Sequence, residues 1–408
     1  MAARLAFWGA YTIWSAGDDA PLTTLNDDRR FRGGPHYEPN VVIARHPNSE
    51  FDKNFGVRSI QNIEHPTQKD SQGRWFVGFN PGDDKANLCR LLDHLEQADF
   101  LILGAGNFVN QDSHDLFRGP LSHAYVMAHL ASVAKTPVML YGINASSLHT
   151  DSARRVAQWL LDHASILTFR DSLSVDLLAG SGIDVPSHSI LPDPALGARP
   201  ANLEARDAVD AVMGVSKGFR LAVAPRWTEW NPALRTFEST LEIVNLWLRH
   251  HDDADVLIVP QCTYSDVHDD DDRTIARALR RASVAPERVF FPAKRLLPWA
   301  VEGLYSSADV ALAVRLHGAV FASRAGLPTI GLSYREKVKA FFSEINQDSN
   351  CFSLPVSPMA VFERLIFLLD SREAHSKEIT KTIEVLRQDV KKYGELLSAS
   401  LEGRPQFG

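Results

Sequence analysis

The chain has 408 residues, of which 45% are hydrophobic and 23% are charged, and its formal net charge at pH 7 is -7. This composition is typical of a folded protein and excludes a fibrous repeat or a disordered chain. The length predicts two globular domains, because a single core stops growing well below this size. No block of Lys and Arg is present, so we expect no nucleic-acid partner, while a local basic pocket for a small anion stays open.

Simple sequence patterns indicate the compartment of the protein and the state of its cysteines. The start, MAARLAFWGAY, lacks the apolar length and cleavage site of a signal peptide, and no stretch has the length of a transmembrane segment. We therefore predict a cytoplasmic protein. Cys89, Cys262 and Cys351 are odd in number and far apart, with no CxxC pair. Neither a disulfide framework nor a zinc cluster is indicated, and we expect three buried, small apolar side chains.

In the first half of the chain, apolar runs with strand character alternate with amphipathic segments of helical length. The predicted strands are 4–9, 40–45, 99–106, 137–143 and 165–170. The predicted helices lie near 84–97, 120–134, 151–163 and 171–180. Such alternation is typical of a parallel sheet that helices cover on both faces.

The second half repeats this arrangement. Its predicted strands are 219–226, 255–261, 288–293, 309–315 and 328–334. Its predicted helices lie near 233–251, 270–283, 298–306, 318–325 and 335–344, and a last helical segment covers about 374–400. The stretch 193–217 has no apolar strand and holds the domain boundary. We thus predict an α/β protein with two doubly wound, Rossmann-like domains, 1–200 and 201–373, and a helical tail, 374–408. The two domains are expected to face a cleft that binds ligands at the strand carboxyl ends.

One candidate site follows the run DVALAVR, where Arg315, Leu316 and His317 stand at the end of a strand and Gly318 begins a helix-like segment. A helix start there would direct unpaired N–H groups and its positive dipole end at a ligand beside His317. An arginine, an imidazole and a helix start together predict an anion site. The alternative is structural, with Arg315 paired to a carboxylate and His317 at the helix end.

Two other strand ends carry candidate ligand contacts. Arg226 ends the first strand of the second domain, so it is expected in the same cleft as Arg315, and two guanidinium groups suit a phosphate or carboxylate. In the first domain, LILGAGNF ends a strand with Gly104, Gly106 and Asn107, which permits close backbone approach to a ligand. Tight packing of the strand against the following helix would explain these glycines equally well. The full GxGxxG is absent, so no dinucleotide site is predicted.

These residues carry a resemblance to a family. RLHGAVFASRAGLPTIGLSYREKV, preceded by ADVALAV, resembles the signature of the polysaccharide pyruvyl transferases: Arg-Leu-His, a small-residue helix, Gly-x-Pro and Tyr-x-x-Lys. TFRDSLSVDLLAGSGI with LPDPAL, SAGDDAPL and LILGAGNF resemble further segments of that family. The similarity spans about residues 15–340. One departure is Ala105, which interrupts the glycine run.

The resemblance implies a fold like the glycosyltransferase B type and a phosphoenolpyruvate donor. The pyruvyl group would pass as a ketal to hydroxyls of a sugar or glycan acceptor, with release of phosphate. Arg226 and Arg315 would bind the anionic donor and His317 would act as acid or base, a role that its ordinary pKa permits. The first domain would take the acceptor and the second the donor. The predicted substrate-binding residues are Leu316, Gly318, Lys337, Gly104, Gly106, Asn107 and Asp18.

Several residues keep alternative interpretations. Lys337 is either a hydrogen-bond donor at the pocket rim or an exposed helical lysine. Arg170 and Asp171 are expected to form a structural pair, and Asp18 and Asp19 to touch acceptor or cap the first helix. The run 268–273, HDDDDR, is interpreted as a solvated helix start, with a divalent cation site as the lesser alternative. Histidines without metal-ligand spacing are His36, His114, His123 and His149, and we predict neither a metal nor a cofactor.

Two other functions stay open. A B-type glycosyltransferase that uses a nucleotide sugar would share the fold, and a non-catalytic protein could bind a glycan or sugar phosphate there. The sequence leaves the acceptor and the oligomeric state open, a homo-oligomer included.

Overall fold

The computed structural model describes residues 3–31, 38–63, 81–111, 119–201, 218–228, 231–263 and 271–403, with backbone alone at 81–85. Contacts divide the chain into two compact units. Unit 1 comprises Met1–Ile13, Pro21–Ala198 and Gln388–Gly408, and unit 2 comprises Trp14–Ala20 and Arg199–Arg387. These bounds differ from the expected ones in two places. The short segment 14–20 belongs to unit 2, and so does the first part of the expected tail, up to Arg387.

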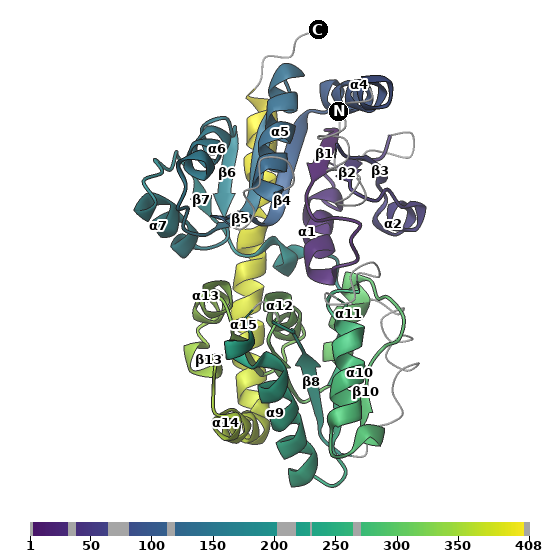
Figure 1. The fold of residues 1–408 in the computed structure, drawn as a ribbon, viewed down its shortest axis with the longest axis vertical. Coiled ribbons are helices and arrows are strands. Elements are labelled where there is room, and N and C mark those ends of the chain that lie inside the picture. Colours follow the sequence, from purple (N-terminus) through teal and green to yellow (C-terminus); the bar gives the residue numbers. More distant parts are fainter. Residues whose placement is uncertain are drawn as a thin grey trace. The chain divides into compact units, whose positions relative to one another are not determined.

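Unit 1 is built on one parallel sheet with the strand order β3-β2-β1-β4-β5-β6-β7 (Figure 1). Its strands are β1 (Leu5–Trp8), β2 (Val41–Ala44), β3 (Arg58–Gln61), β4 (Phe100–Val109), β5 (Val138–Ala145), β6 (Ile166–Phe169) and β7 (Ser189–Ile190). The five strands predicted for this half are present. The two outermost strands, β3 and β7, were not predicted, because both are short and only partly buried.

Some of the helices associated with this sheet begin where a polar side chain satisfies a first-turn N–H group. They are α1 (Ala16–Asn26), α2 (Ser49–Phe55), α4 (Pro81–Glu96), α5 (Pro120–Val133), α6 (Asp151–Asp162), α7 (Ser172–Gly180) and α16 (Lys392–Glu402). Asn48 caps α2, Thr150 caps α6 and Asp171 caps α7. Helix α16 is fixed to unit 1 by buried Tyr393, whose hydroxyl donates to the Pro192 carbonyl over 3.0 Å.

Unit 2 has a second parallel sheet with the order β10-β9-β8-β11-β12-β13. Its strands are β8 (Arg220–Ala224), β9 (Asp255–Ile258), β10 (Val289–Phe290), β11 (Val310–Ala313), β12 (Thr329–Ser333) and β13 (Cys351–Ser353). Counted along the chain within the unit, this order is 3-2-1-4-5-6, the Rossmann arrangement. The order reverses between β8 and β11, and ligands bind outside the strand carboxyl ends at such a switch point.

The helices of unit 2 are α9 (Thr236–His250), α10 (Asp272–Ala282), α11 (Pro298–Tyr305), α12 (Leu316–Arg324), α13 (Glu336–Glu344), α14 (Pro358–Asp370) and α15 (Arg372–Val390). Helix α14 and strand β13 were not predicted. The expected single segment 374–400 is two helices, α15 and α16, which separate at Lys391. Most of the expected linker 193–217 lies outside the described residues.

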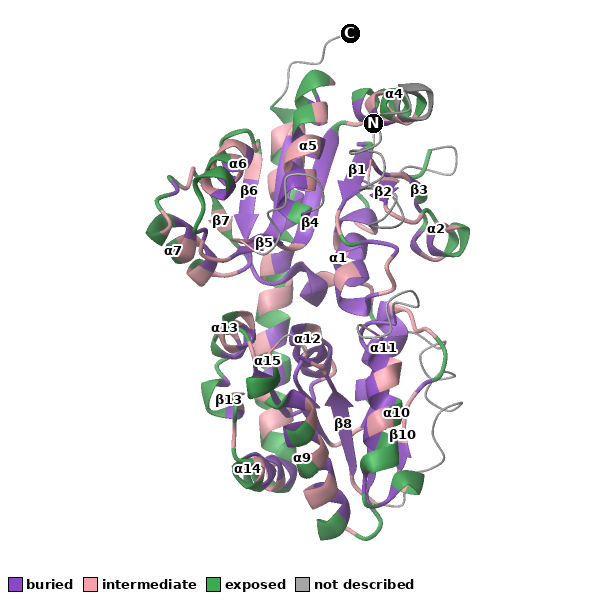
Figure 2. Cartoon of the chain, in the orientation of Figure 1, coloured by how far each residue is buried: buried purple, intermediate pink, exposed green. Residues whose placement is uncertain are grey.

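Each sheet is the centre of an apolar core. The central strands β4, β5, β8, β11 and β12 are almost wholly buried, while the helices keep exposed residues on their outer sides (Figure 2). The predicted α/β class with doubly wound parallel sheets is confirmed. The expectation of three buried cysteines holds for Cys262 but is wrong for Cys89, which is exposed on α4, and for Cys351, which is only partly buried; none of the three forms a disulfide. Among the described helices, none combines the length and apolarity needed to cross a bilayer.

Candidate functional site

The predicted arginines follow the two strands that flank the switch point of unit 2. In the parallel register, Ala313 of β11 lies opposite Ala224 of β8. Arg226 and Arg315 each stand two residues beyond these alanines, at the carboxyl ends of neighbouring strands. Neighbouring strands are about 4.8 Å apart, so the two arginines leave the sheet side by side. Both strands end earlier than expected, at Ala224 and Ala313, and both side chains are half-buried.

A buried carboxylate fixes Arg315. Asp272, at the start of α10, is fully buried and accepts from Nη2 and Nε of Arg315 over 2.6 and 3.1 Å. Its other oxygen accepts the backbone N–H groups of Gln261 and Cys262, both over 2.9 Å. Burial raises the pKa of Asp272, but four donated hydrogen bonds and the adjacent guanidinium favour the ionised form, so the pair is ionised. Burial alone would lower the pKa of Arg315, yet the charge and hydrogen bond of Asp272, together with the nearby Cys262 and Tyr334, outweigh it and raise that pKa.

This result corrects the interpretation of the acidic run 268–273. Residues 268–270 lie outside the described residues. The other two acids do begin a helix, since Asp271 is the N-cap of α10, but neither is solvated: their exposed fractions are 7% and 0%. The structural alternative for Arg315, a carboxylate partner, is thus present. The Arg315 side chain still has an exposed fraction of 16%, so the ion pair does not enclose it completely.

Helix α12 begins at this strand end, earlier than the expected Gly318. Arg315 is its N-cap residue and provides no side-chain hydrogen bond to the first turn, which holds Leu316, His317 and Gly318. Leu316 is buried in the core, so only its backbone N–H can serve a ligand. A Cβ on Gly318 would lie 2.3 Å from Cβ of Ala224, so packing of α12 on β8 requires glycine here.

Residues from the beginning of the chain adjoin His317. The first turn of α1 belongs to unit 2, where the Ala16 N–H donates to the Gln261 carbonyl over 2.8 Å. A Cβ on Gly17 would lie only 2.0 Å from Nδ1 of His317, so the imidazole rests directly against the backbone of α1. Gly17 was not among the predicted site residues. The glycine-aspartate turn SAGDD was the signal that indicated it.

A tyrosine lies among the cations of this strand edge. Tyr334 directly follows β12, the neighbour of β11, and its ring packs against the core of unit 2. Burial alone would raise the pKa of this phenol. The positive charges of Lys337, Arg315, Arg226 and Arg335, in that order of effect, outweigh burial and lower it. The charges of the predicted residues Arg226, Arg315 and Lys337 thus all act on this phenol.

The glycine-rich strand end belongs to unit 1. Gly104 and Gly106 have φ of +135° and +150°, which favours glycine. A Cβ on Gly104 would lie 2.3 Å from the Tyr141 carbonyl oxygen, whereas a Cβ on Gly106 would have no neighbouring atom within 4 Å. Tight strand packing thus explains Gly104, and Gly106 leaves open space. Asn107 is half-buried, and its backbone carbonyl accepts a hydrogen bond of 2.6 Å from the side-chain amide of Asn110.

Of the remaining candidates, Arg170 and Asp171 have structural partners, and contact of Asp18 with an acceptor stays a prediction. Asp18 and Asp19 lie inside the first turn of α1 rather than at its N-cap, so the capping alternative is wrong in detail. Arg170 and Asp171 do not pair with each other. Arg170 forms a buried ion pair with Asp193 over 2.6 Å, and Asp171 caps α7 and accepts from the Asn144 amide.

The histidines that lack metal-ligand spacing, and any metal ion, are a separate question from His317. His36 and His114 lie outside the described residues. In the ranges that the structure describes, no group of three or more His, Cys, Asp or Glu side chains could hold a metal ion.

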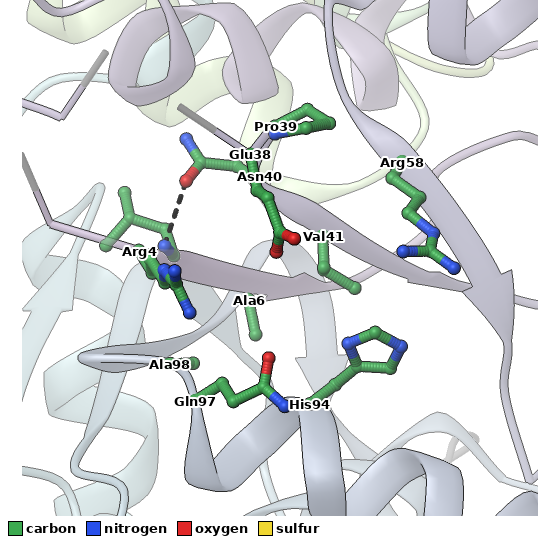
Figure 3. A pocket seen from close by; sticks show the side chains of 11 residues that line it. Arg4, Ala6, Glu38, Pro39, Asn40, Val41, Arg58, His94, Gln97 and Ala98 are labelled. Carbon is green, nitrogen blue, oxygen red and sulfur yellow. Dashed lines mark hydrogen bonds between the residues drawn. The ribbon is translucent and has the colours of Figure 1, made fainter. Parts of the chain in front are cut away.

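A cavity of about 100 Å³ lies elsewhere, at the amino ends of strands in unit 1 (Figure 3). Arg4, Glu38, Arg58, His94 and Gln97 direct polar groups around it. Burial, and then the charge of Arg58, lowers the pKa of His94. None of the predicted site residues lines this cavity, and it lies at the sheet edge opposite to the strand carboxyl ends.

Comparison with solved structures shows the fold. The chain resembles Anabaena HepE in complex with UDP-glucose, with a TM-score of 0.63, 11% identity and coverage of 98% of this chain and 100% of that one. It also resembles the UDP-GlcNAc 2-epimerase from Neisseria meningitidis bound to UDP-GlcNAc, with a TM-score of 0.61, 12% identity and coverage of 98% and 100%. For the trehalose-6-phosphate synthase OtsA the TM-score is 0.56 at 11% identity, with coverage of 99% and 100%. The fold is therefore of the glycosyltransferase B type.

Sequence comparison gives the family. No curated protein matches the chain. The family model described as polysaccharide pyruvyl transferase matches residues 29–336. The matched range includes strand β2, the glycine-rich end of β4 and the segment from Arg315 to Glu336. The chain belongs to the polysaccharide pyruvyl transferase family.

Proposed function

We propose that the protein is a transferase that moves the pyruvyl group of phosphoenolpyruvate onto two hydroxyls of a sugar or glycan and releases phosphate. The observation that carries the proposal is the position of Arg226 and Arg315 after the carboxyl ends of β8 and β11, the neighbouring strands at the switch point of unit 2. We further propose that the reaction takes place in the cytoplasm.

The charge of the donor fits this edge. Phosphoenolpyruvate carries a phosphate and a carboxylate on one small enol. Arg315 is held by Asp272 without being completely enclosed, Arg226 stands on the neighbouring strand, and the first turn of α12 directs N–H groups to the same edge. Guanidinium groups bind such anions in a bidentate manner, and a helix N-terminus favours negative charge. The site therefore offers separate partners for the two anionic groups.

The chemistry then requires proton transfer. Protonation of the methylene carbon uses the electrons of the enol double bond and leaves an oxocarbenium-like centre at the neighbouring carbon. An acceptor hydroxyl attacks that centre and loses its proton to a base. A second hydroxyl then displaces phosphate, which gives the ketal. His317, in the first turn of α12 and packed against Gly17, is the proposed acid or base of these steps.

A second candidate is a glycosyltransferase that uses a nucleotide sugar. The observation in its favour is the likeness in fold to proteins whose crystals contained UDP-glucose or UDP-GlcNAc. Fold alone does not determine the reaction, since this architecture supports many chemistries. The two candidates differ in the donor that they bind.

The deciding experiment measures phosphate release from phosphoenolpyruvate with a panel of glycan acceptors, for the wild type and for His317→Gln. We expect the variant to keep its melting temperature while turnover falls roughly 10²- to 10⁴-fold, the usual contribution of general acid-base catalysis. His149→Gln, an exposed histidine of unit 1, is the control. Turnover of a nucleotide sugar in place of phosphoenolpyruvate would establish the second candidate, and full activity of His317→Gln would remove the imidazole from the mechanism.

A further inference from the structure

We propose that Tyr334 is a second proton-transfer residue of the donor site, and that its hydroxyl protonates the departing phosphate. This inference rests on the proposed function and adds a residue to it. The role was not part of our expectation for the strand ends, where Arg226, Arg315 and His317 were the catalytic candidates.

The position of Tyr334 follows from the sheet. Ala313 of β11 lies opposite Gly331 of β12, so Arg315 falls opposite Ser333 and beside Tyr334. Arg226 follows the next strand, β8, in the same register. The Tyr334 ring packs against the apolar core of unit 2, and the Ser333 hydroxyl donates to the Arg335 carbonyl over 2.9 Å. Tyr334 thus follows its strand at the same carboxyl edge of the sheet as Arg315 and Arg226.

The electrostatic surroundings separate Tyr334 from the other buried tyrosines. Burial raises the pKa of Tyr141 in unit 1 and of Tyr305 in unit 2 well above the usual value. Tyr334 is also largely enclosed, yet Lys337, Arg315, Arg226 and Arg335 lower its pKa. Asp272 forms an ion pair with Arg315, one of these cations. The phenol of Tyr334 therefore differs from those of Tyr141 and Tyr305 in the direction of its pKa shift.

The reaction needs more than one proton-transfer group. Two acceptor hydroxyls each lose a proton; one proton ends on the methylene carbon, which becomes a methyl group, and the other ends on the released phosphate. In the second step the bond between the central carbon and the phosphate oxygen breaks, and its electron pair stays on that oxygen. Tyr334 donates its proton to the phosphate. The surrounding cations stabilise the phenolate until the proton of the second acceptor hydroxyl, carried through solvent, restores it.

Two variants test this role. Tyr334→Phe keeps the ring in the core and removes only the hydroxyl, so we expect kcat to fall about 10²-fold while KM for phosphoenolpyruvate changes little. The wild type should lose activity at alkaline pH with a pKa below that of an ordinary tyrosine, because the donor must be protonated, and Tyr334→Phe should lack this limb. Lys337→Gln removes a cation that lowers the pKa, so the alkaline limb should move to higher pH.

The control is Tyr125→Phe, which removes a tyrosine hydroxyl on α5 of unit 1, where the ring packs against Trp159. Its kcat and alkaline limb should equal those of the wild type. If wild-type protein releases phosphate from phosphoenolpyruvate and Tyr334→Phe does so equally fast, the role of Tyr334 is wrong and the proposed function stands. If the wild type releases none with any acceptor, both proposals fail together.

Discussion

Asp272 shows how one buried side chain determines what its neighbours can do. It is fully buried and accepts two hydrogen bonds from Arg315 and two from backbone N–H groups at the end of β9. An arginine held in this way presents its remaining edge in one orientation, which a bidentate anion contact requires. The carboxylate is thus a positioning residue for Arg315 rather than a contact to a ligand.

We predict that Asp272→Asn lowers the free energy of unfolding by about 3 to 5 kcal/mol, the cost of leaving one member of a buried ion pair without its counter-charge. Chemical denaturation measures this change. The matched control is Asp271→Asn at the neighbouring N-cap, where Asn caps as well as Asp and only the charge paired with Arg273 is lost, so we expect a loss of about 1 kcal/mol or less. Equal and small losses in both variants would show that the Asp272 charge does not hold the site together.

The sequence was sufficient for the residues whose position depends on strand ends. Arg226, Arg315 and His317 could be predicted because polar residues that follow buried parallel strands share one edge of a sheet. Asp272 could not be predicted, because it stands in an acidic run that resembles a solvated helix start, and only the fold shows that α10 turns it inward. Gly17 was missed as a site residue because its contact with His317 joins segments far apart in the chain.

At the scale of elements, α12 packs so closely on β8 that its first turn depends on Gly318. We predict that Gly318→Ala destabilises the protein by about 1 to 3 kcal/mol, the usual cost of overpacking, since the new Cβ would lie 2.3 Å from Cβ of Ala224. Thermal unfolding measures the loss. Gly403→Ala is the control, because its nearest neighbour would lie at an ordinary 3.5 Å. An unchanged melting temperature for Gly318→Ala would mean that α12 can shift freely on the sheet.

The elements that sequence analysis missed share a physical reason. Central strands are continuous apolar runs and were found, whereas β3, β7 and β13 are short edge strands with polar or exposed residues. Helix α14 was different, because it carries both a serine cap and an amphipathic pattern over Pro358–Asp370. Its signal was present in the sequence and was not used.

At the scale of the whole molecule, the proposed donor site belongs to unit 2 alone. We predict that phosphoenolpyruvate slows amide hydrogen exchange at residues 226–228, 315–319 and 334–338, because a ligand that binds only the folded state suppresses its local opening. Exchange at 104–107 in unit 1 should not change without an acceptor. Mass spectrometry of peptides measures both regions. Protection confined to 104–107 would place the donor in unit 1.

The division of the chain between the units also bears on how the protein is made. Residues 14–20 are synthesised long before the rest of unit 2, which is finished only when Arg387 has been made. Unit 1 in turn waits for α16, whose Tyr393 ring packs edge-on against Tyr141. Neither half can close its core as soon as it emerges, although domains usually fold in order during synthesis. Nascent chains should therefore keep unfinished apolar surface exposed until α15 and α16 have been made.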